Sequence, residues 1–127
     1  MARVLPPLSE SQLEIMNVVW DFGECTVADV LEHLRQRRPI TRNTVQTMMS
    51  RLDDKGWLNH RDEGTKFVYS ASVRRERVQR QLVDQVVNTA FDGSAEGLVL
   101  ALRQNRTLTR AEAMRIRRMI QEAEERS

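Results

Sequence analysis

The stretch that decides the fold runs from Thr41 to Leu52 and reads TRNTVQTMMSRL. Its apolar residues recur at helical spacing, Thr41 is placed to cap the helix, and Gly56 is placed to stop it. With the apolar stripe turned inward, the opposite face carries short polar side chains and one guanidinium, whereas an ordinary solvent face more often holds Glu and Lys. Such groups can approach base edges in the major groove, so we interpret them as base contacts. They are Asn43, Thr44, Thr47 and Arg51.

Two further helices are predicted before this stretch. Ser9 with Gln12 forms a capping-box pattern for the first helix, which Gly23 ends. Thr26 then caps a short second helix, and Pro39 closes it and its linker. The first part of the chain is therefore expected to hold three helices.

The spacing of apolar residues changes after Gly56 from helical to extended. Residues 57–60 and 66–70 are predicted strands, and Gly64 between them supplies the positive φ that a tight turn requires. The pattern predicts a wing of two or three strands beside the helices. Its aromatic side chains are interpreted as residues that pack the wing on the core, not as platforms for stacked bases. They are Trp57, Phe67 and Tyr69.

The remainder of the chain shows no strand signal and is predicted to be helical. The fold class is thus mainly α, with a winged helix-turn-helix in residues 1–72 and a helical dimerisation unit in residues 73–127. A unit of about fifty-five residues cannot bury all of its apolar surface alone, so a second copy is expected to complete its core. The alternative is a monomer whose last helices fold back on its own winged helix. The expected dimerisation residues are Leu82, Val83, Val86, Val87, Phe91, Leu98, Leu100, Leu102, Ile116, Met119 and Ile120.

Charge is distributed unevenly along the chain. Residues 1–34 carry one basic and six acidic side chains, whereas residues 35–80 carry twelve basic and five acidic ones. Residues 81–127 carry seven basic and seven acidic side chains. A positive middle segment suits the phosphates of nucleic acid, although charge alone does not exclude a solvated arginine-rich surface. The expected phosphate contacts flank the third helix and lie on the wing. They are Arg38, Arg42, Arg61 and Lys66.

The residues that enzymes and metal proteins need are sparse. Cys25 is the single cysteine, which excludes an intrachain disulfide and a cysteine-cluster metal site. His33 and His60 lie on different predicted elements without ligands at metal spacing, and no phosphate loop or nucleophile motif occurs. We therefore expect no enzyme, cofactor or metal. No apolar run is long enough to span a membrane and residues 1–8 lack a signal-peptide layout, so a cytoplasmic protein is expected.

Several motifs resemble those of the penicillinase-repressor family, the BlaI, MecI and CopY type. The resemblance spans residues 5 to about 120 and rests on the runs at 8–20, 41–52, 55–58 and 67–69. It implies a winged-helix transcriptional repressor that binds double-stranded DNA at palindromic operators as a homodimer through its C-terminal helices. The alternative is a non-enzymatic adaptor that uses a winged-helix scaffold to bind another protein.

The sequence departs from two branches of that family. The copper-sensing branch carries paired Cys-x-Cys motifs near its C-terminus, and here that region has no cysteine. The antibiotic-resistance branch is inactivated by a regulatory protease at an Asn-Phe bond, and Ala101-Leu102 stands at the corresponding position here. The resemblance implies a regulatory protease or another signal partner, whereas the operator and the inducing signal stay open.

Overall fold

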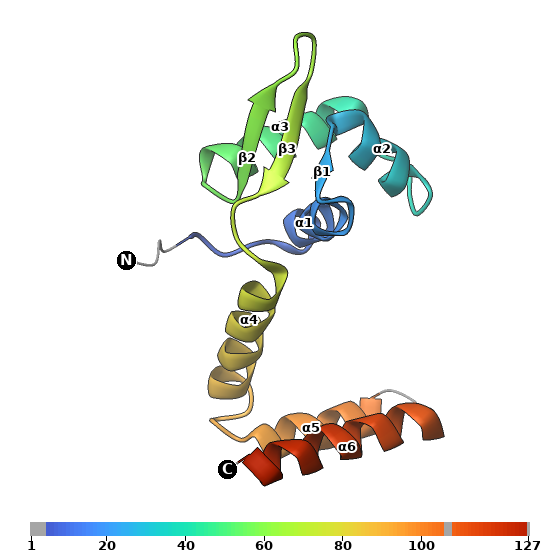
Figure 1. Cartoon of the computed structure of the whole chain (residues 1–127), viewed down its shortest axis with the longest axis vertical. Coiled ribbons are helices and arrows are strands. Elements are labelled where there is room, and N and C mark those ends of the chain that lie inside the picture. The colour runs from blue at the N-terminus through green and yellow to red at the C-terminus, as the bar shows by residue number, and fades with distance from the viewer. Residues whose placement is uncertain (1–4, 106–107, 127) are drawn as a thin grey trace. The chain divides into compact units, whose positions relative to one another are not determined.

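The computed structural model describes residues 5–105 and 108–126, which form two compact units, 1–80 and 81–127 (Figure 1). Each unit is described by itself. Helix α4 begins in the first unit and ends in the second. The elements in chain order are α1 (Glu10–Phe22), β1 (Glu24–Cys25), α2 (Val27–Arg35), α3 (Arg42–Asp54), β2 (Leu58–Asp62), β3 (Phe67–Ala71), α4 (Arg75–Thr89), α5 (Ala95–Asn105) and α6 (Arg110–Arg126).

The first three helices begin at the predicted caps. The Ser9 hydroxyl accepts the Gln12 N–H at 3.2 Å, and the Gln12 side chain accepts the Ser9 N–H at 2.9 Å. Thr26 forms the same reciprocal pair with Asp29 at the start of α2. Thr41 caps α3 through its hydroxyl. These bonds satisfy backbone donors that the first helical turn leaves unpaired, which is why local sequence sets where each helix begins.

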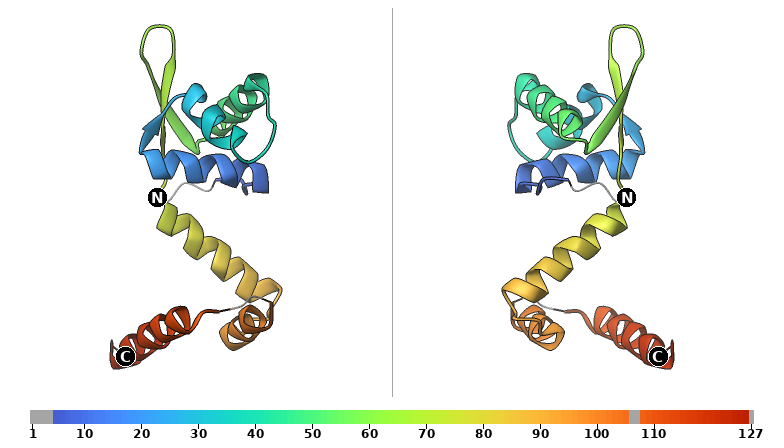
Figure 2. Two further views of the ribbon diagram at one scale, coloured as in Figure 1. Left: turned by 90° about the vertical axis from the view of Figure 1, so that its right-hand side faces the viewer. Right: turned by 90° about the vertical axis from the view of Figure 1, so that its left-hand side faces the viewer.

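The wing is a three-stranded antiparallel sheet in the order β1-β3-β2. The hairpin of β2 and β3 lies beside α3, and its turn projects beyond the helices in every view (Figures 1 and 2). Gly64 in that turn has a φ of +80°, as the hairpin interpretation predicted. The third strand, β1, adds Cys25 opposite Tyr69. The predicted mainly helical winged-helix fold is therefore confirmed.

One core joins the three helices to the sheet in the first unit. Tyr69 and Trp57 are only 4 and 5% exposed, as predicted for wing residues that pack on the core. The same prediction for Phe67 was wrong, because this side chain is 44% exposed. Phe67 shares a strand face with Tyr69, but it pairs with Asp62 at the last position before the turn, beyond the reach of the core. The buried apolar residues are Ile15, Met16, Val18, Val19, Cys25, Val30, Leu31, Leu34, Val45, Met49, Leu52, Trp57, Leu58, Tyr69 and Val78.

The start of α4 belongs to the core of the first unit. Val78 is buried there, and the Arg75 guanidinium donates to the Asn17 carbonyl at 2.9 Å and to the Asp21 carboxylate at 2.7 Å. The compact unit therefore extends to Arg80, past the boundary after residue 72 that the sequence suggested. Residues 5–80 therefore have an apolar interior of their own.

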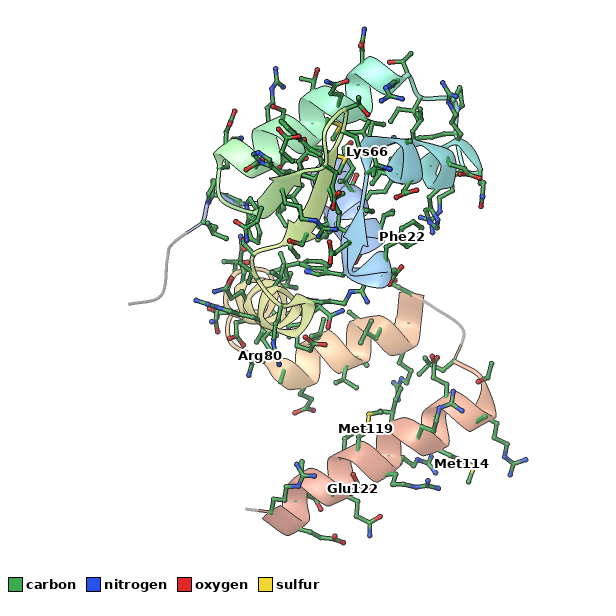
Figure 3. The ribbon with its side chains drawn as sticks, turned by 45° about the horizontal axis from the view of Figure 1, so that its top comes forward. Phe22, Lys66, Arg80, Met114, Met119 and Glu122 are labelled. Atoms are coloured by element: carbon green, nitrogen blue, oxygen red, sulfur yellow. The ribbon has the colours of Figure 1, made fainter. Side chains whose placement is uncertain are left out.

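The second unit leaves much of its apolar surface uncovered. Neither α5 nor α6 has a fully buried residue. Met114 and Met119 on α6 are both more than half exposed (Figure 3). Of the expected dimerisation residues, Val87, Phe91, Leu98 and Ile116 are half-buried. The exposed ones are Leu82, Val83, Val86, Leu100, Leu102, Met119 and Ile120.

Within the described ranges, no helix is both long and apolar enough to cross a membrane.

Cys25 is expected to resist thiol reagents in the native protein. Its side chain is buried on β1, and burial raises its pKa from an ordinary 9.0 to about 11, with the Asp29 carboxylate adding to the rise. Because the thiolate is the reactive form, iodoacetamide near pH 8 should label the folded protein slowly and the urea-unfolded protein quickly. Rapid labelling of the folded protein would contradict this burial.

The raised pKa of Cys25 makes the stability of the fold depend on pH. A folded-state pKa above the unfolded value means that the neutral thiol stabilises the fold fully below pH 9.0. That contribution is lost as the pH rises from about 9 to about 11.

Candidate nucleic-acid interface

The outward face of α3 is a continuous row of polar side chains. The inward face holds Val45, Met49 and Leu52, which are fully buried. The exposed residues follow at intervals of three and four, so they share one side of the helix. Together with two wing aromatics they line a hollow between α3 and β3. Its lining residues are Asn43, Gln46, Thr47, Ser50, Arg51, Phe67 and Tyr69.

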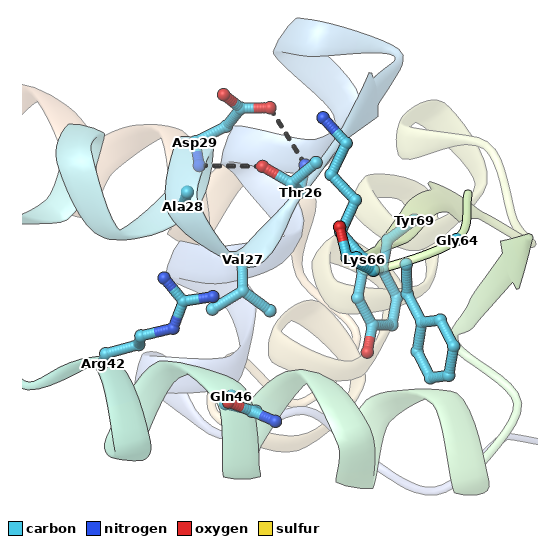
Figure 4. Close-up of a pocket in the computed structure, with 11 residues that line it drawn as sticks. Thr26, Val27, Ala28, Asp29, Arg42, Gln46, Gly64, Lys66 and Tyr69 are labelled. Carbon is cyan, nitrogen blue, oxygen red and sulfur yellow. Dashed lines mark hydrogen bonds between the residues drawn. The ribbon is translucent and has the colours of Figure 1, made fainter. Parts of the chain in front are cut away.

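A second hollow lies between the start of α2, the start of α3 and the turn of the wing. Arg42 and Gln46 from α3 line it, as does Lys66 from the turn just before β3 (Figure 4). The capping box of Thr26 and Asp29 forms another part of its wall (Figure 4). The two hollows share Gln46, Phe67 and Tyr69, so the polar face and the two cations belong to one surface.

The four expected phosphate contacts differ in their surroundings. Arg42 and Lys66 have no ion pair with any residue in the described ranges. Arg38 instead pairs with Glu14 at 2.6 Å. Arg61 pairs with two carboxylates, those of Glu24 and Glu63. Exposed ion pairs contribute little free energy, so these two arginines remain able to exchange a carboxylate for a phosphate.

The four expected base contacts differ as well. The Thr44 hydroxyl lies 2.9 Å from the Thr41 hydroxyl, which also accepts the Thr44 N–H, so Thr44 takes part in the helix cap. The Thr47 hydroxyl has no hydrogen bond to the described residues and faces the hollow with Asn43 and Arg51. This arrangement favours Thr47 over Thr44 as the threonine available to a ligand.

Sequence reasoning missed two residues in the polar row of α3. Gln46 and Ser50 line the hollow beside Asn43 and Thr47. The four positions 43, 46, 47 and 50 repeat the helical spacing that identified the buried stripe. The same periodicity, applied to the polar side chains, would have found them.

The wing is joined to the far end of α3 by a chain of side-chain contacts. His60 on β2 pairs through Nδ1 with the Asp53 carboxylate in the last turn of α3. The His60 ring stacks on Phe67 with centroids 4.3 Å apart. Burial raises the pKa of Tyr69, and the carboxylates of Asp53 and Asp54 add to the rise, so this phenol stays neutral in ordinary buffers. The wing and α3 therefore present one connected surface.

The chemistry of this surface is that of binding. Amide and hydroxyl groups on α3 can donate and accept hydrogen bonds, and the cations beside them can neutralise phosphates. The described part of the chain has no cluster of three or more His, Cys, Asp or Glu residues that could hold a metal ion.

Comparison of the sequence with known proteins agrees on one family. A family model described as penicillinase repressor matches residues 8–122. The chain is 28% identical over 120 residues to the penicillinase repressor of Bacillus licheniformis, with 94% of each chain covered. It is 21% identical over 113 residues to the methicillin resistance regulatory protein MecI of Mammaliicoccus sciuri, with 89% of this chain and 92% of that protein covered. These relatives are named as regulators, not as enzymes.

Two solved structures of BlaI resemble more than half of the chain. The DNA-binding domain of the repressor BlaI matches with 34% identity and a TM-score of 0.53, covering 58% of this chain and 90% of that chain. The monomeric form of Bacillus licheniformis BlaI in complex with the blaP half-operator matches with 34% identity and a TM-score of 0.50, covering 57% and 89%.

Proposed function

The chain belongs to the penicillinase repressor family, and we propose that it is a transcriptional repressor that binds duplex DNA with α3 in the major groove. The observation that carries this proposal is the polar face of α3, exposed beside Arg42 and Lys66, two cations that form no ion pair within residues 5–105 and 108–126. A related protein of solved structure is in complex with a half-operator, which supports DNA as the ligand. Binding to chromosomal DNA would place the protein in the cytoplasm.

We further propose that the protein acts as a homodimer on a palindromic operator. The exposed apolar side chains of the second unit support a second copy as the group that covers them. A two-fold dimer sets its two recognition helices about 34 Å apart, one turn of the duplex, so the two half-sites must be inverted copies.

Replacement of Thr47 tests base recognition. Thr47→Ala is expected to cost about 1 to 3 kcal/mol of binding free energy on the selected operator and little on random duplex. The operator is first found by selection from a random library and by footprinting of the chain's own promoter. The matched control is Thr89→Ala on α4, because Thr89 is an exposed threonine outside the interface. Equal losses on operator and random duplex would remove Thr47 from base recognition.

Replacement of Arg42 tests phosphate contact in the same assay. Arg42→Ala is expected to weaken binding to operator and random duplex alike, and to lower the slope of log K against log salt by about one. Arg103→Ala on α5 is the control, since Arg103 is exposed but lies outside the interface. An unchanged slope for Arg42→Ala would place this arginine away from phosphates.

A further inference from the structure

Phe67 is an exposed aromatic ring beside the polar row of α3. Its side chain lines both hollows and is 44% exposed. In the hollow against α3 it lies beside Gln46, Thr47 and Ser50, all of which can form hydrogen bonds. The part of the ring that is in contact with water contributes no hydrophobic stabilisation to the free protein.

Contacts with the protein hold the ring in this exposed position. His60 stacks on one side of it at 4.3 Å with an angle of 23° between the rings. His60 is itself paired with Asp53 on α3, and Tyr69 meets Phe67 edge-on at 6.3 Å. The ring is therefore oriented before any ligand binds, so little conformational entropy is lost when it is covered.

The ligand that covers it must offer an apolar group among hydrogen-bonding groups. In the major groove the largest apolar group is the C5-methyl of thymine, since the base edges otherwise present hydrogen-bond donors, acceptors and the small C5–H of cytosine. Phenylalanine is one of the side chains suited to contact it.

We propose that Phe67 packs on the C5-methyl of one thymine in each half-site and thereby makes the wing a reader of sequence. This inference rests on the proposed function, because it requires α3 to lie in the major groove. His60 acts as a positioning residue that supports the ring from behind through Asp53.

Replacement of thymine by deoxyuridine isolates the methyl group. The probe is the tightest duplex selected from a random library, with each thymine of one half-site replaced in turn by deoxyuridine. The full-length protein is expected to lose affinity about fourfold at one position, which is what burial of one methyl group contributes. Phe67→Ala should bind the thymine and deoxyuridine duplexes equally at that position and keep its sensitivity at any other.

Phe22→Ala is the matched control. Phe22 lies at the end of α1 (Figure 3). Its side chain is 48% exposed and lines neither hollow. This variant should keep the fourfold difference. Phe67→Leu should keep part of it, because a smaller apolar group remains. Thermal melting of each variant shows whether it is folded.

The outcomes separate this inference from the proposed function. If the full-length protein selects no duplex, the proposed function itself fails. If it binds its selected duplex but no thymine shows a methyl effect that depends on Phe67, only the role of Phe67 is overturned. An equal effect of deoxyuridine on wild type and folded Phe67→Ala overturns it in the same way.

Discussion

A chain shortened to residues 1–80 is expected to bind a duplex with two half-sites about 100 to 10,000 times more weakly than the full chain. The shortened chain keeps the core and the interface of the first unit but lacks the apolar surface of α5 and α6. Without a partner, each winged helix binds one half-site alone and loses the high effective concentration that linkage to a second copy supplies. Titration of both proteins on the same labelled duplex measures the ratio.

Two controls make this result specific to dimerisation. On a duplex with a single half-site, the two proteins should bind almost equally. In the full chain, Val83→Glu combined with Met119→Glu should reproduce the loss, because both side chains are more than half exposed on the surface proposed to meet the second copy. Sedimentation showing a monomeric full-length chain at micromolar concentration, or undiminished operator binding by residues 1–80, would refute the dimer.

Trp57→Ala is expected to lower the free energy of unfolding by about 3 to 5 kcal/mol, a larger loss than for any other variant proposed for this protein. The indole is buried where β2 begins, and its N–H donates to the Pro6 carbonyl at 3.0 Å. Removal leaves a cavity in the core and takes away the hydrogen bond that ties residues before α1 to the wing. Urea unfolding followed by circular dichroism measures the change.

Phe67→Ala is the comparison for Trp57→Ala. Both residues are wing aromatics, but Phe67 is 44% exposed and lies outside the core, so its replacement should cost less than about 1 kcal/mol. Similar losses for the two variants would mean that Phe67 contributes to the core as much as Trp57 does. That result would also weaken its assignment to DNA.

The sequence by itself determined where the first three helices begin and which side of each faces the core. Ser9, Thr26 and Thr41 cap these helices through hydrogen bonds to residues three positions away. Because such bonds join neighbours in the chain, they can be recognised without the tertiary structure. The inward stripe of α3 follows from helical periodicity in the same way.

Only the tertiary structure decided which of the predicted site residues lie close together and which already form ion pairs within the protein. The strand β1 has only two residues, too few for a recognisable pattern, and exists because it pairs with β3 more than forty positions later. Arg38 and Arg42 look alike in sequence, but only Arg38 has Glu14 beside it, from a helix 24 positions earlier. Phe67 and Tyr69 lie on the same face of β3, as their spacing predicts. They differ only in their distance from the core, which leaves Phe67 exposed and Tyr69 buried. These outcomes depend on contacts between distant parts of the chain, which spacing and composition do not specify.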